Sequence, residues 1–480
     1  MANRRFLEYL SHEETADIHC ATLQVLEEIG VVFPAPSALQ ILEDAGCSVD
    51  AAAQRVRFPP ALVEDAIRQA PSSFGLYGRD GRLHIRLGDG CSHFCPNALA
   101  VNVVDLDGHF RPSTLDDVAN LARLADALPH VHEGHGSVHP TDLPDGMAHP
   151  QAMLAMFRNT TKPFKARGWG RQQALDSIRM SEVVAGGSDR LRMRPIIMRN
   201  INSVSPLAHG KELLEGALEF VGRGLPVIMT PEIQFGGTGP ITLAGALVQQ
   251  NAEILSFFTL AQVVRPGTPL VYGTVSSSMD MRRGSLPYAT VEACLFNVLT
   301  AQMARFYGVP SRGSGGVSDA HVEDAQAGAD AAAGLFAAVT GGVNHIQGAG
   351  GLSSSLTTSY GKLVADSELF GYLRRFADGV DVDANALALE TIRETGVLGT
   401  YLNKRHTLTN LKAGALWMPD LLVRDARERW QNLGAKELRD SARARAEHLL
   451  RTHQPEPLTT EVERELQGIM REIESRELGR

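Results

Sequence analysis

From about residue 131 onward, short apolar segments alternate with longer segments that carry apolar residues at helical spacing. This alternation predicts β-α units around a parallel sheet. Turn residues after the apolar segments recur every 31 to 42 residues, which suits a (β/α)8 barrel of ~250 residues with lengthened loops. The six predicted strands are FKARGW, PIIMRNINS, PVIMTPE, PLVYGTVSS, PSRGSGG and VNHIQGAG. We expect the other two near residues 131–140 and 395–402.

The segments on either side of this region follow other patterns. Residues 12–30 carry apolar residues at helical spacing and end at Gly30, and two later segments turn at Asp-Gly pairs, as β-hairpins do. Residues after about 419 are highly charged and helical in pattern, which favours a cap with a solvated face. We therefore predict an α/β fold. It consists of an N-terminal helical and β-hairpin addition (1–130), a (β/α)8 TIM barrel (131–418) and a C-terminal helical segment (419–480).

Two loops rich in glycine and serine lie within residues 306–360, separated by one alanine-rich helical segment. Small residues at the carboxyl end of a strand let a ligand approach the backbone closely. Successive β-α units place such loops at one end of the barrel, where active sites of this fold lie. The alternative is that the glycines only form turns.

Composition narrows the class of protein. The chain has 480 residues, of which 44% are hydrophobic and 21% charged, and its net charge is −9. The negative charge argues against a nucleic-acid surface. No apolar run reaches the ~20 residues of a transmembrane helix, and the N-terminal residues lack the apolar region of a signal peptide. We expect a cytoplasmic protein without membrane contact. No dinucleotide or P-loop glycine pattern occurs in the required context, which disfavours nucleotide-phosphate chemistry.

Two groups of cysteine and histidine residues are candidates for a metal site. Five cysteines are an odd, sparse set, so we expect no disulfide framework. Cys91 and Cys95 flank His93, but no second pair of zinc-ribbon type follows. Four histidines lie close together at a spacing that matches no standard zinc motif: His130, His132, His135 and His139. Free thiols and hydrogen-bonded histidines are the favoured interpretation, and we expect no tightly bound metal.

Several stretches together resemble the trimethylamine/quaternary-amine:corrinoid methyltransferase family (MttB-like). They are PSRGSGGVSDAHVEDAQAG, GGVNHIQGAGGLSSSLTTSY, the pair His406–Thr407 and LWMPDLLVRDARERW. N-terminal stretches such as HCATLQVLEEIGVVF are similar to the same family, so the resemblance covers nearly the whole chain. It implies a (β/α)8 barrel that moves a methyl group from an amine onto the cobalt of a cobalamin. A separate corrinoid carrier protein holds that cobalamin.

The trimethylamine enzymes of this family carry pyrrolysine in the barrel. This sequence runs through the corresponding region, about 343–360, with standard residues only. It therefore resembles the non-pyrrolysine branch, whose characterised members demethylate quaternary amines such as glycine betaine, proline betaine and carnitine. The chemistry agrees, because a quaternary ammonium already bears a good leaving group, a neutral tertiary amine. The protein then needs mainly to orient and desolvate its substrate. The resemblance implies a methyltransferase for glycine betaine or a related betaine.

The barrel fold places the active site at the carboxyl ends of the strands. An N-methylated cation favours aromatic faces and a carboxylate there. We expect the side chains of Tyr272, Glu232 and His345 to converge on one cavity. The candidates for substrate contact are Trp169, Glu232, Tyr272, Gln347 and Phe94, with Asn97 beside Phe94, and the candidate catalytic residue is His345. Each of these side chains could instead serve in core packing or in structural hydrogen bonds.

Two further sets complete the predicted site. A betaine carboxylate needs a cationic partner, and three arginines near strand ends could supply it: Arg167, Arg199 and Arg312. The sequence does not choose among them. Contacts to the corrinoid are predicted from the first glycine-rich loop, at Gly313, Ser314, Gly315, Gly316, Ser318 and Asp319.

Other functions stay open at this point. One is a trimethylamine-type methyltransferase. Another is a barrel hydrolase or lyase, which would need a carboxylate or lysine pair; Lys162 and Lys165 are the lysines near early strands. A third is a non-catalytic barrel that binds betaine or a corrinoid protein. The expected partners are a small quaternary amine and the corrinoid carrier protein, and a homo-oligomer is possible.

Overall fold

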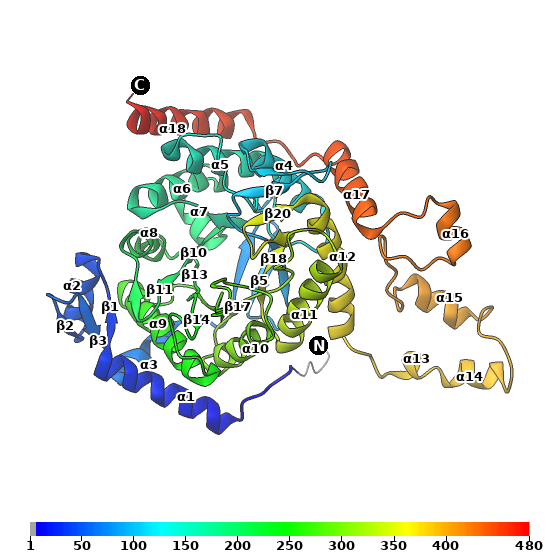
Figure 1. Cartoon of the computed structure of the whole chain (residues 1–480), viewed down its shortest axis with the longest axis horizontal. Coiled ribbons are helices and arrows are strands. Elements are labelled where there is room, and N and C mark those ends of the chain that lie inside the picture. The colour runs from blue at the N-terminus through cyan, green and yellow to red at the C-terminus, as the bar shows by residue number, and fades with distance from the viewer. Residues whose placement is uncertain (1–5, 480) are drawn as a thin grey trace.

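The computed structural model describes residues 6–479 and is built around a curved, seven-stranded parallel sheet (Figure 1). Every neighbouring pair of strands in this sheet is parallel. In spatial order the strands are β6 (His93–Pro96), β18 (His345–Ala349), β17 (Ser311–Ser314), β15 (Leu270–Gly273), β13 (Val227–Met229), β10 (Ile197–Ile201) and β9 (Phe164–Ala166). The six strands expected from the apolar segments are confirmed.

The two edges of the sheet approach each other across residues 131–134. The backbone N–H of His132 donates to the carbonyl of Phe94 in β6 at 2.8 Å, and that of Gly134 donates to the carbonyl of Pro163, just before β9, at 2.9 Å. The segment expected near 131–140 therefore lies between the edge strands, although the strand ladder itself is not closed. The prediction of a strand near 395–402 is wrong: Thr395 ends a helix, residues 396–402 form turns and irregular backbone, and Val397 is 96% exposed. β6, from far earlier in the chain, pairs with β18 instead.

Amphipathic and apolar helices cover the outside of the sheet (Figure 1). Side-chain caps begin several of them: Thr290 accepts from Ala293 N, Asp324 from Ala327 N and Ser359 from Lys362 N. The longest of these helices, α9 (Leu243–Val264), is buried on almost every side, because the N-terminal helices pack over it. The covering helices are α6 (Gly170–Ala185), α8 (Lys211–Gly222), α9 (Leu243–Val264), α10 (Val291–Phe306), α11 (Ala325–Gly341) and α12 (Tyr360–Ala377).

The N-terminal part forms a small α/β unit against α9. Its helices are α1 (His12–Gln24), α2 (Pro36–Asp44) and α3 (Pro60–Gln69), with the π-helical turn η1 (Val25–Ile29) after α1. A five-stranded sheet lies beside them, in the order β11 (Ser203–Val204), β12 (Ala208–His209), β1 (Val31–Val32), β3 (Arg55–Arg57) and β2 (Ser48–Asp50). Strands β11 and β12 follow β10, so this sheet joins the N-terminal unit to the barrel region.

The first predicted hairpin, β4 (Phe74–Tyr77) with β5 (Leu83–Leu87), closes the amino-terminal end of the barrel. Leu76, Ile85 and Leu87 of this hairpin cluster with inward-facing side chains of three barrel strands. Those side chains are Met198, Ile228 and Val271. The hairpin thus acts as an apolar plug beneath the sheet.

The second predicted hairpin, β7 (Asn102–Val104) with β8 (Phe110–Pro112), lies at the other end. It joins β20 (Thr357–Ser359) and β19 (Gly351–Leu352) in a four-stranded sheet. A short parallel pair, β14 (Gln234–Phe235) and β16 (Ser277–Ser278), lies after β13 and β15. Helices α4 (Leu115–Ala127) and α5 (Asp145–Asn159) pack against each other, and α7 (Ser188–Met193) packs on α6. Thr114 and Asp117 form a capping box at the start of α4.

The C-terminal part divides into an arm and two packed helices. The arm leaves the body after α12 and carries α13 (Ala384–Leu387), α14 (Leu389–Thr395), α15 (Arg405–Lys412) and α16 (Arg427–Asn432), none with a buried residue (Figure 1). The chain then returns as α17 (Leu438–Thr452), which packs on α12 and α4, and α18 (Thr460–Leu478), which packs on α5 and α6. Within residues 6–479, no helix has the length and hydropathy needed to cross a membrane.

Candidate active site

A cavity of about 690 Å³ opens at the carboxyl ends of β9, β10 and β18. A smaller cavity of about 200 Å³ adjoins it and shares several wall residues, including Asn200, Glu232 and Gln347. The position agrees with the end of the barrel that carries active sites. Side chains of the larger cavity include Leu99, His135, His139, Asp145, His149, Lys165, Arg167, Trp169, Gln173, Arg199, Asn202 and Leu213.

The alternation of side chains along each strand decides which residues reach this space. On β15, Val271 points inward to the hairpin plug, so Tyr272 points outward. Its hydroxyl donates to Asn251 of α9, and its ring lies 5.8 Å from that of Tyr307 at the end of α10. The prediction that Tyr272 forms a wall of the cavity is therefore wrong. Its neighbour in sequence, Val271, has the inward position.

The prediction that Phe94 contacts the substrate is also wrong, because its side chain points away from the barrel interior. On β6 it lies between His93 and Cys95, and its side chain faces the covering helix α12. There the ring stacks on Phe370 with centroids 5.1 Å apart and an interplanar angle of 14°. Phe94 is therefore a core residue and not a substrate contact. Asn97, just after β6, does line the smaller cavity, where its amide donates to Ser355 O at 3.0 Å.

A buried charged cluster lies inside the barrel beside the cavity. Nε2 of His345 and Oε1 of Glu133 are 2.9 Å apart, and Nζ of Lys165 lies 3.2 Å from the other oxygen of Glu133. Burial lowers the pKa of His345 to about 4, although Glu133 opposes that shift. Burial would raise the pKa of Glu133, but Lys165 and His345 outweigh it and hold it below its ordinary value. The cluster is thus a Lys⁺/Glu⁻ pair with a neutral histidine.

Three side chains of this part of the barrel are of types that ligate metals. Cys95, Glu133 and His345 offer ligand atoms within 4.8 Å of one another. However, Lys165 already compensates the single carboxylate, and burial raises the pKa of the Cys95 thiol well above its usual value. One hydrogen bond, between His345 and Glu133, and one ion pair, between Lys165 and Glu133, connect the group. The expectation of no tightly bound metal stays a prediction.

The predicted candidates His345 and Gln347 have different positions. His345 is fully buried and is not part of either cavity wall. Glu133 and Lys165 connect it to the larger cavity, and its catalytic role stays a prediction. Gln347 lines both cavities, and its side-chain oxygen accepts from Arg312 Nη2 at 2.9 Å. The predicted convergence of Tyr272, Glu232 and His345 thus reduces to Glu232 on the cavity wall, with His345 below it.

The three candidate arginines differ in their hydrogen-bond partners. Arg312 donates to Thr274 O and to Gln347, and Nη2 of Arg199 donates to Gly168 O at 2.9 Å. Arg167 lies on the wall of the larger cavity, and in the described part of the chain none of its three guanidinium nitrogens has a hydrogen-bond partner. Burial lowers the pKa of Arg167 to about 10, still well above neutrality. The cavity therefore contains a buried cation with its hydrogen-bonding capacity unused.

Glu232 and Trp169 add a carboxylate and an indole to the wall of the larger cavity. Glu232 follows β13 and accepts a hydrogen bond from the hydroxyl of Tyr288. Trp169, the residue before α6, is 64% exposed and lies at the rim. An acidic group and an indole face therefore border the same space as Arg167, so the walls present both signs of charge.

The six residues predicted to contact a corrinoid mostly build the loop itself. Only Ser314 lines a cavity, the smaller one. Gly315 N donates to Gln347 O at 2.9 Å, and Ser318 Oγ donates to Asp330 at 2.7 Å. Asp319 accepts from Tyr288 N and Ala289 N and so holds the segment that supports Glu232. The two remaining positions pack closely: Gly313 against Asn297 and Gly316 against Phe94. Their role toward a corrinoid stays a prediction.

Sequence reasoning missed Glu133, Tyr288 and Asn202. Glu133 lies within the segment that drew attention for its histidines, so an acidic residue in an expected strand was an available signal. The histidines themselves divide: His135 and His139 line the larger cavity, while Nδ1 of His132 accepts from Phe94 N at 3.0 Å. Nothing in the sequence near Tyr288 indicates that its hydroxyl reaches Glu232.

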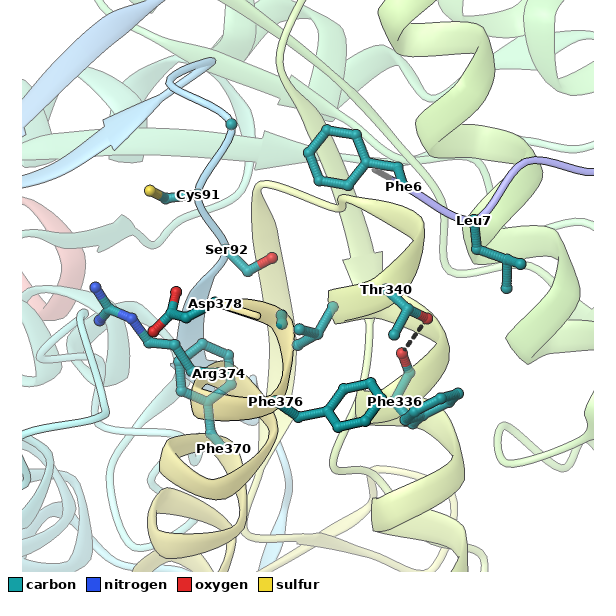
Figure 2. A pocket seen from close by; sticks show the side chains of 13 residues that line it. Phe6, Leu7, Cys91, Ser92, Phe336, Thr340, Phe370, Arg374, Phe376 and Asp378 are labelled. Atoms are coloured by element: carbon teal, nitrogen blue, oxygen red, sulfur yellow. Dashed lines mark hydrogen bonds between the residues drawn. The ribbon is translucent and has the colours of Figure 1, made fainter. Parts of the chain in front are cut away.

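A third cavity, of about 420 Å³, lies just before β6 begins and between α11 and α12. Figure 2 shows Phe336, Phe370 and Phe376 around it, with the hydroxyl of Thr340 donating to Phe336 O at 2.6 Å. Its lining is largely aromatic and aliphatic and lies away from the strand ends where the charged groups gather. Ser92, Thr340, Arg374 and Asp378 are the polar side chains of its lining.

The chain is similar to several known proteins over nearly its whole length. The family described as trimethylamine methyltransferase (MTTB) matches residues 1–476. A glycine betaine methyltransferase of Desulfitobacterium hafniense (strain Y51) is 35% identical over 463 residues, with 96% of each chain covered. Trimethylamine methyltransferase MttB of D. hafniense (strain DSM 10664 / DCB-2) is 33% identical, covering 97% of this chain and 93% of its own. The solved monomethylamine methyltransferase (MtmB) of Methanosarcina barkeri aligns with a TM-score of 0.48 and 13% identity, over 91% and 92% of the two chains.

Proposed function

The chain belongs to the trimethylamine methyltransferase family, and from this premise we propose that it demethylates a quaternary amine, glycine betaine or a related betaine. It is an enzyme of the corrinoid-dependent amine methyltransferase type. The methyl acceptor in our proposal is the Co(I) of a corrinoid held by a separate carrier protein. The corrinoid is thus a substrate that visits the cavity mouth.

The observation that carries the substrate class is the mixed charge of the cavity. Glu232 and the indole of Trp169 suit a quaternary ammonium, which aromatic faces and carboxylates attract. Arg167, whose guanidinium makes no hydrogen bond within residues 6–479, lies on the wall of the same space and suits an anion. A betaine carries both charges on one small molecule. Trimethylamine has no anionic group and would leave the basic part of the wall without a partner.

The transfer step needs little acid–base chemistry from the protein. The bond between the methyl carbon and nitrogen breaks, and its electron pair stays on nitrogen, so glycine betaine leaves as neutral-nitrogen dimethylglycine. The carbon–cobalt bond forms with the two electrons of Co(I), which becomes methyl-Co(III). The chain's own groups orient the ammonium and exclude water. A neutral His345 is consistent with this assignment, because no proton changes place at the reacting carbon.

The finer architecture also belongs to the proposal. We take residues 131–134 as the eighth position of a (β/α)8 barrel, because their backbone bonds reach both edge strands. The division into 1–130, 131–418 and 419–480 is kept, with the qualification that β6 of the first part pairs within the barrel sheet. A cytoplasmic location is part of the same proposal.

A donor panel tests the proposed function. Purified protein is incubated with free cob(I)alamin, or with a cognate corrinoid protein, and conversion to methylcob(III)alamin is followed by absorbance. Glycine betaine, proline betaine, carnitine, choline and trimethylamine are compared side by side. We expect turnover with at least one betaine. Turnover with trimethylamine alone would instead support the second candidate, which the 33% identity to trimethylamine methyltransferase MttB favours.

A panel without any turnover would support the non-catalytic reading, provided the corrinoid protein had been supplied. Binding of a betaine without turnover would then identify a sensor or binding barrel. A hydrolase or lyase is disfavoured, because Lys165 is already paired with Glu133 and Lys162 donates to three backbone carbonyls. Neither lysine is free to act as a base.

A further inference from the structure

Arg167 combines burial with an absence of partners. The residue is 6% exposed, and within residues 6–479 its Nε, Nη1 and Nη2 atoms make no hydrogen bond. A guanidinium has five N–H donors and stays charged near neutral pH. A buried charge without a partner is costly, so such positions in folded proteins are normally paired or bind a ligand. The cavity is where that partner would lie, because Arg167 is part of its wall.

The two neighbouring arginines show what a satisfied guanidinium looks like in this site. Arg312 donates to a backbone carbonyl and to the side chain of Gln347, which fixes its plane. Arg199 donates to Gly168 O and lies over the ring of Phe220 at 5.8 Å. Both retain an unbonded Nε, but each also has a fixed partner at one Nη or more. Arg167 has none.

The backbone holds Arg167 firmly although its side chain is unpaired. It follows β9 directly, and its carbonyl accepts from Ser177 Oγ of α6 at 2.9 Å. Ser177 in turn lies 2.8 Å from Nε2 of His149, whose pKa burial lowers to about 3. A neutral histidine adds no charge that would compensate Arg167. The carboxylate of the nearby cluster, Glu133, is already paired with Lys165.

We propose that Arg167 binds the carboxylate of the substrate and thereby makes the enzyme select N-methylated amino acids over other quaternary amines. This inference rests on the proposed function, which it deepens by naming the group that is recognised. A planar guanidinium can engage both carboxylate oxygens through two parallel N–H bonds. The ammonium then lies toward Glu232 and Trp169 on the same cavity wall. Choline has a neutral hydroxymethyl group in place of the carboxylate, so it cannot form this ion pair with Arg167.

Equilibrium binding tests this without the corrinoid partner. Isothermal titration calorimetry compares glycine betaine and choline on the full-length wild type, Arg167→Met and Arg167→Lys. The matched control is Arg305→Met, a partly buried arginine that donates to Gly341 O away from the cavity. We expect the wild type to prefer glycine betaine over choline. Arg167→Met should weaken glycine betaine by about 10- to 100-fold, the range for a charge-assisted bond, and leave choline within threefold.

Arg167→Lys keeps the charge but loses the fork, so it should fall between the wild type and Arg167→Met for glycine betaine. Thermal melts report whether each variant is folded. If Arg167→Met does not fold, the test rests on Arg167→Lys and the wild type. The inference is wrong if Arg167→Lys has the same ratio of glycine betaine affinity to choline affinity as the wild type. It is also wrong if the wild type does not prefer glycine betaine over choline. Arg305→Met is expected to bind both ligands as the wild type does.

A failure of the inference about Arg167 can be distinguished from a failure of the proposed function. If the wild type transfers methyl groups from glycine betaine and Arg167→Met binds this substrate within threefold of the wild type, the inference is wrong and the proposed function stands. If the wild type binds and demethylates only amines without a carboxylate, the proposed substrate class is wrong, and the inference is wrong with it.

Discussion

Oε1 of Glu133 lies 2.9 Å from Nε2 of His345, inside the barrel and away from solvent. The other oxygen of Glu133 meets Lys165 at 3.2 Å. Lys165 is on the edge strand β9, and His345 is on β18 near the opposite edge. One carboxylate from the bridging segment therefore joins the two sides of a sheet whose strand ladder does not close.

Removing this carboxylate's charge should destabilise the protein. In Glu133→Gln, Lys165 becomes a buried ammonium without a counter-ion, and we expect a loss of about 3–5 kcal/mol in the free energy of unfolding. Urea denaturation measures it. Glu219→Gln is the control, because Glu219 pairs with Arg171 and Arg223 at the surface and should cost at most about 1 kcal/mol. Equal losses in both variants would contradict the linking role of Glu133.

Stability should fall as the pH decreases from about 6.5 toward 4. Burial lowers the pKa of His345 to about 4 and those of His149 and His209 to about 3. In the unfolded chain these groups titrate near pH 6.5, so between the two values the unfolded state binds more protons. Unfolding free energies at pH 7.5 and pH 5.0 test this. His209→Gln should reduce the difference between them, and equal free energies at the two pH values would contradict it.

The outward position of Tyr272 predicts a clear contrast between two aromatic variants. Tyr272→Phe removes only the hydrogen bond to Asn251, so it should cost about 0.5–1.5 kcal/mol of stability and leave substrate affinity unchanged. Trp169→Ala removes the indole at the rim and should weaken binding of a quaternary ammonium by ~0.5–2 kcal/mol. Calorimetry with glycine betaine separates the two. Weaker binding of glycine betaine by Tyr272→Phe would contradict the outward position of Tyr272 and place it in the substrate site.

The two glycine-rich loops touch at Gly348. Its φ is +142°, and a Cβ there would lie 2.4 Å from the carbonyl oxygen of Gly315. Gly348→Ala should therefore displace one loop, cost about 1–3 kcal/mol and slow methyl transfer, since Gly348 lines the smaller cavity. Gly328→Ala, on α11 with open space around the new methyl group, is the control and should be neutral or stabilising. Unchanged activity in Gly348→Ala would show that the loop contact is dispensable.

Local patterns predicted the barrel strands well because each strand is a short apolar run followed by a turn. They could not predict β6, since its partner β18 lies about 250 residues later and only the folded chain brings them together. The site was predicted less well. Tyr272 and Phe94 were assigned by residue type at strand ends, but inward or outward position depends on register, and a shift of one residue reverses it. Glu232 and Gln347 reach the cavity because their register places them there.

The apolar plug of β4 and β5 packs against the amino-terminal part of the barrel strands, and the charged cavity opens at their carboxyl ends. Under the proposed function, the amine and the carrier protein then share this one end of the barrel. That arrangement predicts an ordered kinetic mechanism, in which the amine enters before the carrier docks and the demethylated product departs after the carrier leaves. Dimethylglycine should therefore inhibit competitively against the betaine and noncompetitively against the carrier.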